Sequence, residues 1–373
     1  MPNVFLDVGR RTESSHILRK NRWKVGASLK KRGPWAVLLS SDLPAGSNRA
    51  PTTKFSVSVQ FMSAELAFNR NADVDYGVAE EVAPGVRRVV ANNPGPYTFL
   101  GTNTYIVGTD EVAIIDPGPA NEAHLDAIAR ATRGQRVSHI FITHSHRDHC
   151  DGALPLQQRL GGEILAFGPT GTERGAIAPG LGDGFVDTAF KPDIPASDGD
   201  TIKGSGFALD VLHMPGHAPD HLCFALIGQR TVFTGDHVMG WNTTVIAPPE
   251  GSMADFLASL ERLAERHDKV FFPGHGGRIE TPRRVVRAYM THRIWREHTI
   301  LACIDEGVGS IPRIVARLYG GLDADLKVAA ALSVLAHLEF LIARGLVATE
   351  GATEGLSAFY VRAASGSGAA ASS

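Results

Sequence analysis

The chain has 373 residues, which is long for one hydrophobic core and predicts two domains. Its composition, 43% hydrophobic and 20% charged with only three cysteines, is that of a soluble globular protein and excludes a disulfide framework, so we expect a reducing compartment and a cytoplasmic location. The net charge of −2 hides an acidic middle, because residues 62–282 hold 16 Lys and Arg against 28 Asp and Glu, whereas residues 1–61 hold 11 against 3.

The basic first segment shows no regular period. Residues 1–61 lack any sustained spacing of strand or helix type and end in turn-forming residues. We predict a disordered extension over residues 1–76, or an upstream in-frame stretch with the true start at Met62. A basic, Ser-rich and acid-poor start is also typical of a mitochondrial transit peptide, whereas the apolar core of a secretory signal is missing.

Regular elements are predicted after Gly77. Two β-rich runs, Thr102–Gly108 and Glu111–Gly118, are separated by a short turn and predict a hairpin. The segment Asn121–Thr132 has helical spacing, with Asn121 placed to cap the helix. Arg136–His144 predicts a buried strand.

A second run of elements follows. A short helix is predicted over Gly152–Leu160 and a strand over Glu163–Phe167, whereas residues 168–206 are rich in Gly, Pro and Asp and predict a loop. The later elements are strands over Phe207–Met214, His221–Ile227 and Thr231–Asp236, a helix over Ser252–Arg266 and a strand over Lys269–His275. This order predicts two β-sheets covered by helices, an α/β domain over residues 77–281.

The chain changes class from Pro282 onward. Three helical patterns precede Gly345–Arg362, which predicts a hairpin, so we expect a small second domain over residues 282–363 and a flexible tail over residues 364–373. The apolar run Val328–Ala343 is short and contains His337 and Glu339, so we expect neither a membrane-spanning helix nor a membrane partner.

The stretch Phe141–Gly152, FITHSHRDHCDG, crowds four ligand-type side chains into six residues, namely His144, His146, Asp148 and His149. Neutral imidazole and carboxylate are ligands that zinc takes. In an extended segment His144 and His146 point to the same side and can share one ion, while Asp148 and His149 lie past the strand end, where a loop can turn them toward a second ion. Such a series rarely arises by chance and predicts a metal site.

Further candidate ligands come after later predicted strands. His217 follows the strand that ends near Met214, and Asp236 and His275 each stand at a strand end. All three lie beside Gly or Pro, which lets backbone segments approach closely and fixes the side chain. Functional residues often lie on loops at one edge of a rigid sheet, so we expect these side chains to join the motif.

These motifs, THSHRDH, PGH, TGD and PGHG in this order, resemble those of the metallo-beta-lactamase superfamily of metallohydrolases over about residues 77–280. The resemblance implies an αββα sandwich and two metal ions per chain, which we expect to be Zn²⁺. It implies that His144, His146 and His217 hold one ion, that Asp148, His149 and His275 hold the other, and that Asp236 bridges them. Asp116, in IIDPG, matches the structural aspartate of the family.

Three other segments, Asn93–Gly108, Gly240–Gly251 and His292–Leu301, are similar to the beta-lactamase-like protein 2 family. That family adds a winged-helix domain after the sandwich, which agrees with the helices and hairpin expected over residues 282–363. Some of its members are endoribonucleases on single-stranded RNA. The long first segment departs from the family pattern.

Several residues near the motifs have a plainer interpretation. We expect His213, His221 and His237 to support the site rather than bind metal, with His221 the best placed for a substrate pocket. Cys150 should be a small buried residue. Asn103 and Thr104 either contact the active site or serve the hairpin, and His292, Arg293 and Arg296 either contact nucleic acid, form a solvated helix face or make an ion pair between domains.

The residues therefore predict a dinuclear zinc hydrolase in which a metal-bound hydroxide attacks a carbonyl or phosphoryl centre, with Asp148 and Asp236 as the catalytic carboxylates. The acidic middle of the chain favours a small ester or thioester substrate, and the family resemblance implies single-stranded RNA as the alternative. A mononuclear-iron persulfide dioxygenase would leave His149 and His275 without a role. A nucleic-acid-binding protein without catalysis would leave the whole ligand set unexplained. The sequence predicts no oligomeric state.

Overall fold

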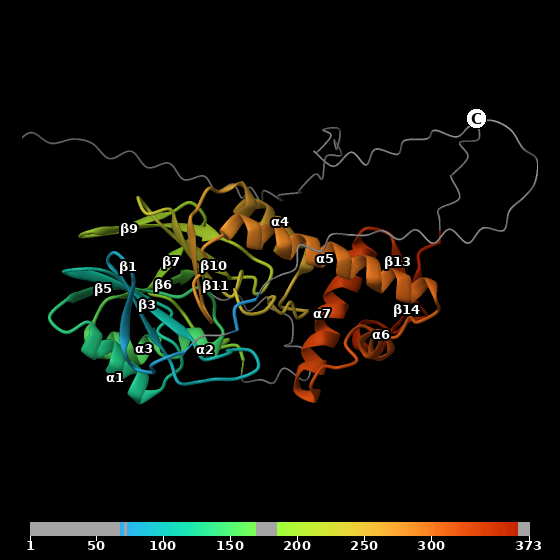
Figure 1. Cartoon of the computed structure of the whole chain (residues 1–373), viewed down its shortest axis with the longest axis horizontal. Coiled ribbons are helices and arrows are strands. Elements are labelled where there is room, and N and C mark those ends of the chain that lie inside the picture. The colour runs from blue at the N-terminus through green and yellow to red at the C-terminus, as the bar shows by residue number, and fades with distance from the viewer. Residues whose placement is uncertain (1–67, 71–72, 169–184, 365–373) are drawn as a thin grey trace, which may run out of the picture. The chain divides into compact units, whose positions relative to one another are not determined.

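The computed structural model describes residues 68–70, 73–168 and 185–364. The predicted extension up to residue 67 and the tail from residue 365 lie outside the described residues. Seven strands form the first sheet in chain order (Figure 1). They are β1 (Ala79–Ala83), β2 (Val86–Val90), β3 (Asn103–Gly108), β4 (Glu111–Ile115), β5 (Arg136–Phe141), β6 (Glu163–Phe167) and β7 (Ile194–Ala196).

The second sheet has five strands in the order β12-β11-β10-β9-β8. These are β8 (Thr201–Gly204), β9 (Phe207–His213), β10 (Leu222–Leu226), β11 (Thr231–Gly235) and β12 (Val270–Pro273). Strands β4 and β5 are parallel, as are β11 and β12, and all other neighbours in the second sheet are antiparallel. Parallel neighbours end at the same sheet edge, so the segments after β4 and β5, and those after β11 and β12, emerge side by side.

The hydrophobic core lies between the two sheets. Phe141 and Leu165 of the first sheet pack with Phe224, Phe233 and Phe272 of the second. Helices α1 (Glu122–Ala131) and α3 (Ala153–Leu160) cover the outer face of the first sheet, and α4 (Met253–Glu265) covers that of the second (Figure 1). Two of these helices have N-terminal caps. The Asn121 side chain accepts a hydrogen bond from the backbone N–H of His124, and the Ser252 side chain accepts one from the backbone N–H of Asp255. The predicted sandwich is confirmed.

A smaller domain follows the sandwich. It contains α5 (Pro282–Asp305), α6 (Ile311–Leu318), α7 (Ala324–Ala343) and an antiparallel pair, β13 (Val347–Glu350) and β14 (Phe359–Arg362), joined through a 3₁₀ turn at Gly355–Ser357. This confirms the predicted helices and hairpin. Val286 and Tyr289 of α5 and Ala336 of α7 join the apolar cluster around Phe256 of α4, so this domain packs on the second sheet's covering helix.

Helix α7 contains a longer apolar segment than the run Val328–Ala343 that we noted in the sequence. The segment Leu326–Ala343 has a mean hydropathy of 1.8 and is long enough to cross a membrane by length and composition, which the sequence reasoning had excluded. Half of this segment is buried within the protein, and Val334, Leu338 and Leu341 pack into the core of the small domain. A core helix of a soluble domain has the same composition.

Four strands and several strand ends differ from the sequence prediction, β4 and β12 among the latter. Residues 168–206, expected to be loop, contain β7 and β8, and the strands β1 and β2 were not anticipated. Strand β5 ends at Phe141, three residues before the predicted end. Residues 68–70, assigned to the extension, contact the sandwich: the Asn69 backbone N–H donates to Gly240 O at 3.0 Å, and the Arg70 Nε donates to Trp241 O at 3.3 Å.

Candidate metal centre

The HSHRDH motif crosses from the end of β5 into a one-turn helix. Residues Ile142–Ser145 continue without strand pairing, His146 adopts extended backbone angles, and α2 (Arg147–Cys150) follows at once. Asp148 and His149 therefore stand on a helix rather than on the loop that we expected. The turn of this helix directs Asp148 and His149 to a different point from His144 and His146, which is what the two-ion prediction requires.

The first cluster contains His144, His146 and His217. The His144 Nε2 lies 2.9 Å from the His146 Nδ1, and the His217 Nε2 lies 3.1 Å from the same Nδ1 atom. His217 comes from the loop between β9 and β10, so two distant segments meet here. With zinc–nitrogen bonds of about 2.0–2.1 Å, ligand atoms of a tetrahedral site stand about 3.3 Å apart, close to the observed separations.

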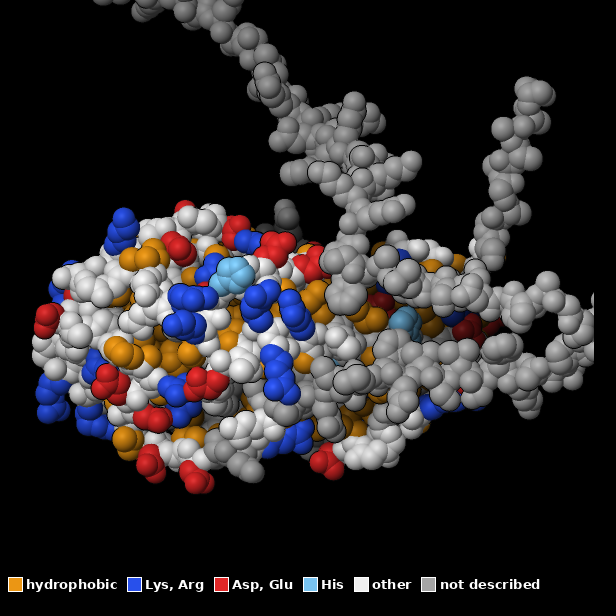
Figure 2. Space-filling view, turned by 45° about the horizontal axis from the view of Figure 1, so that its top comes forward, with side chains coloured by type: hydrophobic (Ala, Val, Ile, Leu, Met, Phe, Trp, Pro, Cys, Tyr) orange, Lys and Arg blue, Asp and Glu red, His pale blue; other side chains and the backbone are white. Residues whose placement is uncertain are grey.

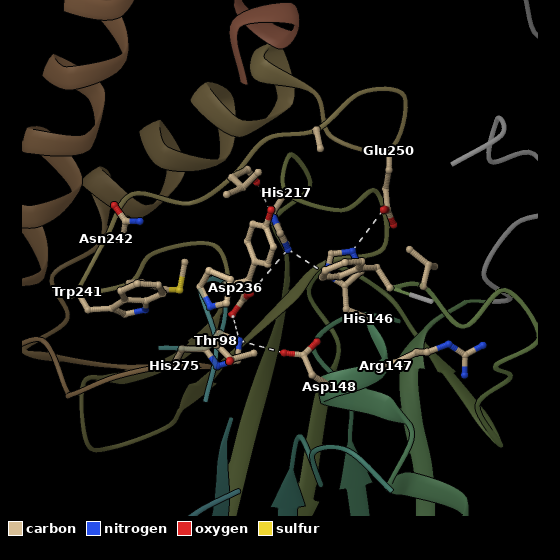
Figure 3. Close-up of a pocket in the computed structure, with 18 of the residues that line it drawn as sticks. Thr98, His146, Arg147, Asp148, His217, Asp236, Trp241, Asn242, Glu250 and His275 are labelled. Atoms are coloured by element: carbon tan, nitrogen blue, oxygen red, sulfur yellow. Dashed lines mark hydrogen bonds and ion pairs between the residues drawn. The ribbon is translucent and has the colours of Figure 1, made fainter. Parts of the chain in front are cut away.

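The second cluster contains Asp148, His149 and His275. The His275 Nε2 lies 3.2 Å from the Asp148 Oδ2 and 3.3 Å from the His149 Nε2. Asp236, at the end of β11, lies between the clusters: its Oδ1 is 3.5 Å from His149 and 3.4 Å from His275, and its Oδ2 is 3.8 Å from the His217 Nε2 (Figure 3). The structure thus brings all seven predicted ligands together.

Each imidazole also has its outward nitrogen held by an oxygen of the protein. The partners are Thr143 Oγ1 for His144 (3.0 Å), Glu250 Oε2 for His146 (3.3 Å), Val245 O for His217 (2.8 Å), Asp116 Oδ2 for His149 (2.9 Å) and Gly101 O for His275 (3.1 Å). Metal-ligating histidines are oriented in this way, because the outer contact fixes the tautomer and the ring angle. The donor set therefore fits two metal ions.

Asp116 clamps the end of β5 to the second cluster. Its Oδ1 accepts from the Thr143 backbone N–H at 2.8 Å, and its Oδ2 accepts from the Thr143 hydroxyl at 2.8 Å and from the His149 imidazole. Asp116 itself has a φ of 51°, a left-handed conformation that aspartate tolerates better than most residues. These contacts agree with the structural role that the resemblance implied.

Close backbone approach explains one glycine of the PGHG motif. A Cβ atom at Gly274 would stand 2.7 Å from both the Asp236 Oδ1 and the His149 Cε1. Any side chain at this position would enter the space in which the two clusters meet. The glycine is therefore required by the centre itself and not by a turn.

Charges are distributed unequally between the clusters. Burial would raise the pKa of the Asp148 and Asp236 carboxyls, but the neighbouring imidazoles outweigh it and hold both pKa values below the ordinary range. Burial would lower the pKa of His275, yet the Asp236 and Asp148 carboxylates raise it to about 10. In the first cluster, burial and neighbouring imidazoles lower the pKa of His144 and His217. Without metal, the second cluster is thus a set of ion pairs and the first is largely neutral.

The clusters form the floor of a cavity of about 650 Å³. Its walls are mainly apolar, formed by Tyr97, Phe185, Met239, Trp241, Val245 and Leu326. Phe99 stacks on Trp241 with ring centres 4.9 Å apart, and Tyr97 meets Phe185 edge to face at 5.5 Å, so both aromatic walls are braced. Among the described lining residues, Arg147 is the only arginine or lysine, and its guanidinium lies 3.2 Å from Asp151.

The supporting residues have specific places. His221 is fully buried behind the clusters, where its Nε2 accepts from the Asp236 N–H at 3.1 Å, so it does not line the cavity for which it seemed best placed. His213 and His237 also lie outside the ligand set, His213 stacked on Phe167 and His237 buried against Phe256. Cys150 is buried and burial raises the pKa of its thiol, which agrees with a structural role.

Asn103 and Thr104 brace the centre from β3. The Asn103 amide donates to Pro273 O at 2.9 Å and to Gly276 O at 2.8 Å, on either side of His275. Thr104 donates to Asp116 O at 2.6 Å. Arg293 and Arg296 are 3% and 7% exposed, so a solvated helix face, one of the three alternatives that the sequence left open, is wrong for both.

Several residues of the site were missed by sequence reasoning, among them Glu250, Trp241 and Arg147. Glu250 contacts the His146 imidazole, Trp241 forms a wall of the cavity, and Arg147 stands at its edge (Figure 3). Glu250 and Trp241 fall in Gly240–Gly251, a segment noted only for its family resemblance. Its run of Pro, Gly and aromatic residues after a ligand was the signal available for both.

Comparison with known families identifies the two folded parts. Residues 97–275 match the metallo-beta-lactamase superfamily, and residues 310–355 match the beta-lactamase associated winged helix domain. The chain contains a metallo-beta-lactamase domain followed by this winged-helix domain. The predicted resemblance to the superfamily is confirmed, and metallo-beta-lactamase domains bind metal ions.

Two curated relatives have informative names. The chain is 28% identical over 266 residues to a lactamase-like protein of Aspergillus niger, covering 66% of this chain and 77% of the relative. It is 32% identical over 229 residues to an atrochrysone carboxyl ACP thioesterase of Paecilomyces divaricatus, covering 61% of this chain and 66% of that protein.

Two solved structures share the fold. A beta-lactamase domain protein from Burkholderia ambifaria has a TM-score of 0.66 at 24% identity, covering 78% of this chain and 96% of its own. A metallo-beta-lactamase family protein from Thermus thermophilus has a TM-score of 0.61 at 24% identity, covering 75% and 99%. The metallo-beta-lactamase sandwich and the small domain are therefore found together in other proteins.

Proposed function

We propose that this protein is a dinuclear zinc hydrolase that cleaves acyl thioesters. One observation carries the proposal: two adjacent three-ligand clusters, with Asp236 between them, lie at the floor of a mainly apolar cavity. His144, His146 and His217 would hold one ion, Asp148, His149 and His275 the other, and Asp236 would contact both. When bound, the ions would activate a water molecule and polarise the carbonyl under attack.

The protein's own residues would position the reactants. Asp148 is one quarter exposed and lines the cavity, so its carboxylate can orient a water molecule above the second cluster. The apolar walls exclude bulk water and can bind the acyl chain, since burial of apolar surface contributes about 25 cal/mol per Å². Trp241 and Phe185 are aromatic members of this wall, and the backing contact of Phe99 holds the Trp241 ring in place.

A thioester substrate is supported by the cavity and by the relatives. A cavity of about 650 Å³ has the size of a small-molecule site. Several relatives are named as acyl carrier protein thioesterases, including those of Paecilomyces divaricatus and Cryptosporiopsis. A thioester needs no large basic surface for binding, which agrees with the acidic middle of the chain.

Single-stranded RNA, the alternative substrate, is less well supported. Arg293 and Arg296, which we expected to contact phosphates in that case, are buried. Arg147 is offset by Asp151 and by Asp187, whose carboxylate lies 4.0 Å away. Figure 2 shows several basic side chains together near the middle of one face, with acidic side chains around them, which is a smaller feature than the clear basic stripe of strong nucleic-acid binders.

We also propose that the protein acts in the cytoplasm on a small-molecule thioester and without a membrane partner. All three cysteines are free and buried, which supports a reducing compartment. An acyl group delivered on a carrier protein would enter the same cavity, so the assay must include both forms of the thioester.

The decisive assay compares four substrate classes on the metal-loaded protein. Acyl thioesters of a small thiol and of an acyl carrier protein, lactones, phosphodiesters and a labelled single-stranded RNA are tested side by side. We expect turnover of thioesters and little of the others. Cleavage of RNA that falls steeply with salt, together with no thioester turnover, would overturn the substrate proposal and leave the metal centre standing.

A further inference from the structure

The segment Val238–Gly251, between β11 and α4, joins the cavity wall to the metal centre. It lines the cavity through Met239, Trp241, Asn242, Thr243, Val245, Ala247 and Glu250. We call it the wall segment. It has no regular secondary structure, so its conformation depends on contacts with other parts of the chain.

The wall segment makes three contacts with the predicted ligands. The Val245 carbonyl accepts from the His217 Nδ1 at 2.8 Å, and Glu250 reaches the outer nitrogen of His146 at 3.3 Å. The Thr244 hydroxyl donates to the Asp236 backbone carbonyl at 2.8 Å. Two predicted ligands of the first cluster and the backbone of Asp236 are thus held by one irregular segment.

Helix α5, the first element of the small domain, fixes the wall segment from behind. The Tyr289 hydroxyl donates to Met239 O and Asn242 O at 2.8 and 2.6 Å, and accepts from the Met239 N–H at 3.0 Å. One turn further, the Arg293 Nη2 donates to the Thr244 carbonyl. Thr244 is therefore held on one side by Arg293 and on the other by Asp236.

Arg293 is unusual as a buried cation. No carboxylate of the described chain pairs with it, and its Nε has no hydrogen-bond partner there. Its guanidinium lies over the Phe256 ring at 5.2 Å. Burial lowers its pKa to about 10, so it remains charged at neutral pH. A buried cation without a carboxylate is costly, and its main polar contact here is a carbonyl next to the residue that orients His217.

We propose that Arg293 is a positioning residue of the metal centre, acting through Thr244 and Val245 on His217 and Asp236. Helix α5, which precedes the part that matches the winged-helix domain, is then part of the active-site framework, because it supplies this contact. Arg293, within HRIWRE at 292–297, belongs to this framework rather than to a nucleic-acid surface. The inference concerns the metal centre only and holds for any substrate.

Metal affinity of variants tests this proposal. Zinc is titrated into metal-free protein against a chromophoric chelator, and the Co²⁺-substituted form is followed by its electronic spectrum. Arg293→Met keeps the buried stem but removes the donor to Thr244. We expect its affinity for the first ion to fall about tenfold or more, since loss of an outer partner of a ligand typically costs about 10–100-fold, and the cobalt spectrum to change.

Two further variants complete the comparison. Arg293→Lys retains charge and a donor and should recover part of the affinity. Arg287→Met alters an exposed arginine on the same helix and should bind both ions like the wild type. A folded Arg293→Met protein with wild-type affinity and an unchanged cobalt spectrum would show that Arg293 serves packing alone, and so would a loss of stability without a loss of affinity.

A second variant tests the proposal if Arg293→Met does not fold. Thr244→Val is nearly isosteric and removes only the hydroxyl that contacts the Asp236 carbonyl. This variant should also bind the first ion more weakly. Wild-type affinity for the first ion in this variant would overturn the proposal. Because no substrate is present in these titrations, their outcome is separate from that of the thioester assay.

Discussion

Metal binding should release protons, and the second ion should release more of them than the first. In the metal-free protein, burial disfavours charge on His149, but the Asp148 and Asp236 carboxylates outweigh it and hold its pKa well above the ordinary value. The pKa of His275 is about 10 for the same reason. Neutral pH is below the pKa of both imidazoles, so both are protonated. Each must lose its proton before it can bind a cation.

The first cluster differs in its proton content. Burial lowers the pKa of His144 and His217, which are neutral already, and only His146, beside Glu250, has a raised pKa. The second ion therefore displaces about two protons and the first at most about one. Between about pH 6 and 8, affinity for the second ion should rise with pH more steeply than affinity for the first ion, with limits of about 100-fold and about tenfold per pH unit, respectively.

Calorimetric zinc titrations in two buffers of different ionisation enthalpy measure these protons directly. A His275→Ala protein, which should bind the first ion alone, gives the proton count of the first cluster as a control. If the second ion binds with an affinity that does not change with pH, His149 and His275 are neutral in the metal-free protein and the ion-pair reasoning is wrong.

Four further outcomes are expected. Asp116→Ala leaves three buried hydrogen-bond donors without an acceptor, at a cost of about 1–3 kcal/mol each. Denaturant unfolding of the metal-free protein should therefore show that the free energy of unfolding falls by at least about 3 kcal/mol. A decrease of less than about 1 kcal/mol would contradict the role of Asp116 as a clamp. Asp236→Ala should weaken the binding of both ions, and His275→Ala should weaken mainly the binding of the second. If elemental analysis finds the full zinc content in Asp236→Ala, Asp236 does not bridge the two ions. Trp241→Ala should raise KM for long-chain or aromatic thioesters about 10–200-fold and leave acetyl thioesters nearly unchanged, whereas equal effects on both would place the acyl group elsewhere. Removal of residues 1–61, which hold no predicted ligand, should leave zinc content and turnover unchanged, and a truncated protein without either would show that the segment is needed.

The convergence of the seven candidate ligands was predictable because each of them carries its own chemical signal. His144, His146, Asp148 and His149 form a dense local motif, and His217, Asp236 and His275 lie at the ends of β-rich runs. The sandwich fixes where these ends meet, and the runs of β-branched and aromatic residues that build its inner strands are visible in the sequence. Strand ends were placed less well, since backbone pairing rather than side-chain pattern decides where β5 stops.

Two of the strands that escaped prediction, β1 and β8, have little apolar signal, whereas β2, VRRVV, has three valines and its signal was overlooked. In β1, AEEVA, three of five side chains are exposed, and β8, TIKG, is a polar strand at a sheet edge. Edge strands of this kind are held by backbone hydrogen bonds to one neighbour, and their side chains do not need to alternate strictly. The loop prediction for residues 168–206 failed for this reason at β8.

The supporting contacts could not be predicted because they join distant parts of the chain. Glu250 meets His146 across 104 residues, and Arg293 meets Thr244 across 49. The sequence around Glu250 or Arg293 contains no local pattern that predicts which residue it contacts. An arginine on a helix is usually solvated, so only packing of α5 against α4 reveals that Arg293 points inward.

The central claim is that two zinc ions in this centre support hydrolysis of a thioester. The most direct measurement follows the hydrolysis rate of a small acyl thioester while zinc is added to metal-free protein. We predict a rate that stays low through part of the titration and reaches its plateau at two zinc ions per chain. Two bound zinc ions with no thioester hydrolysis at any acyl length would contradict this account.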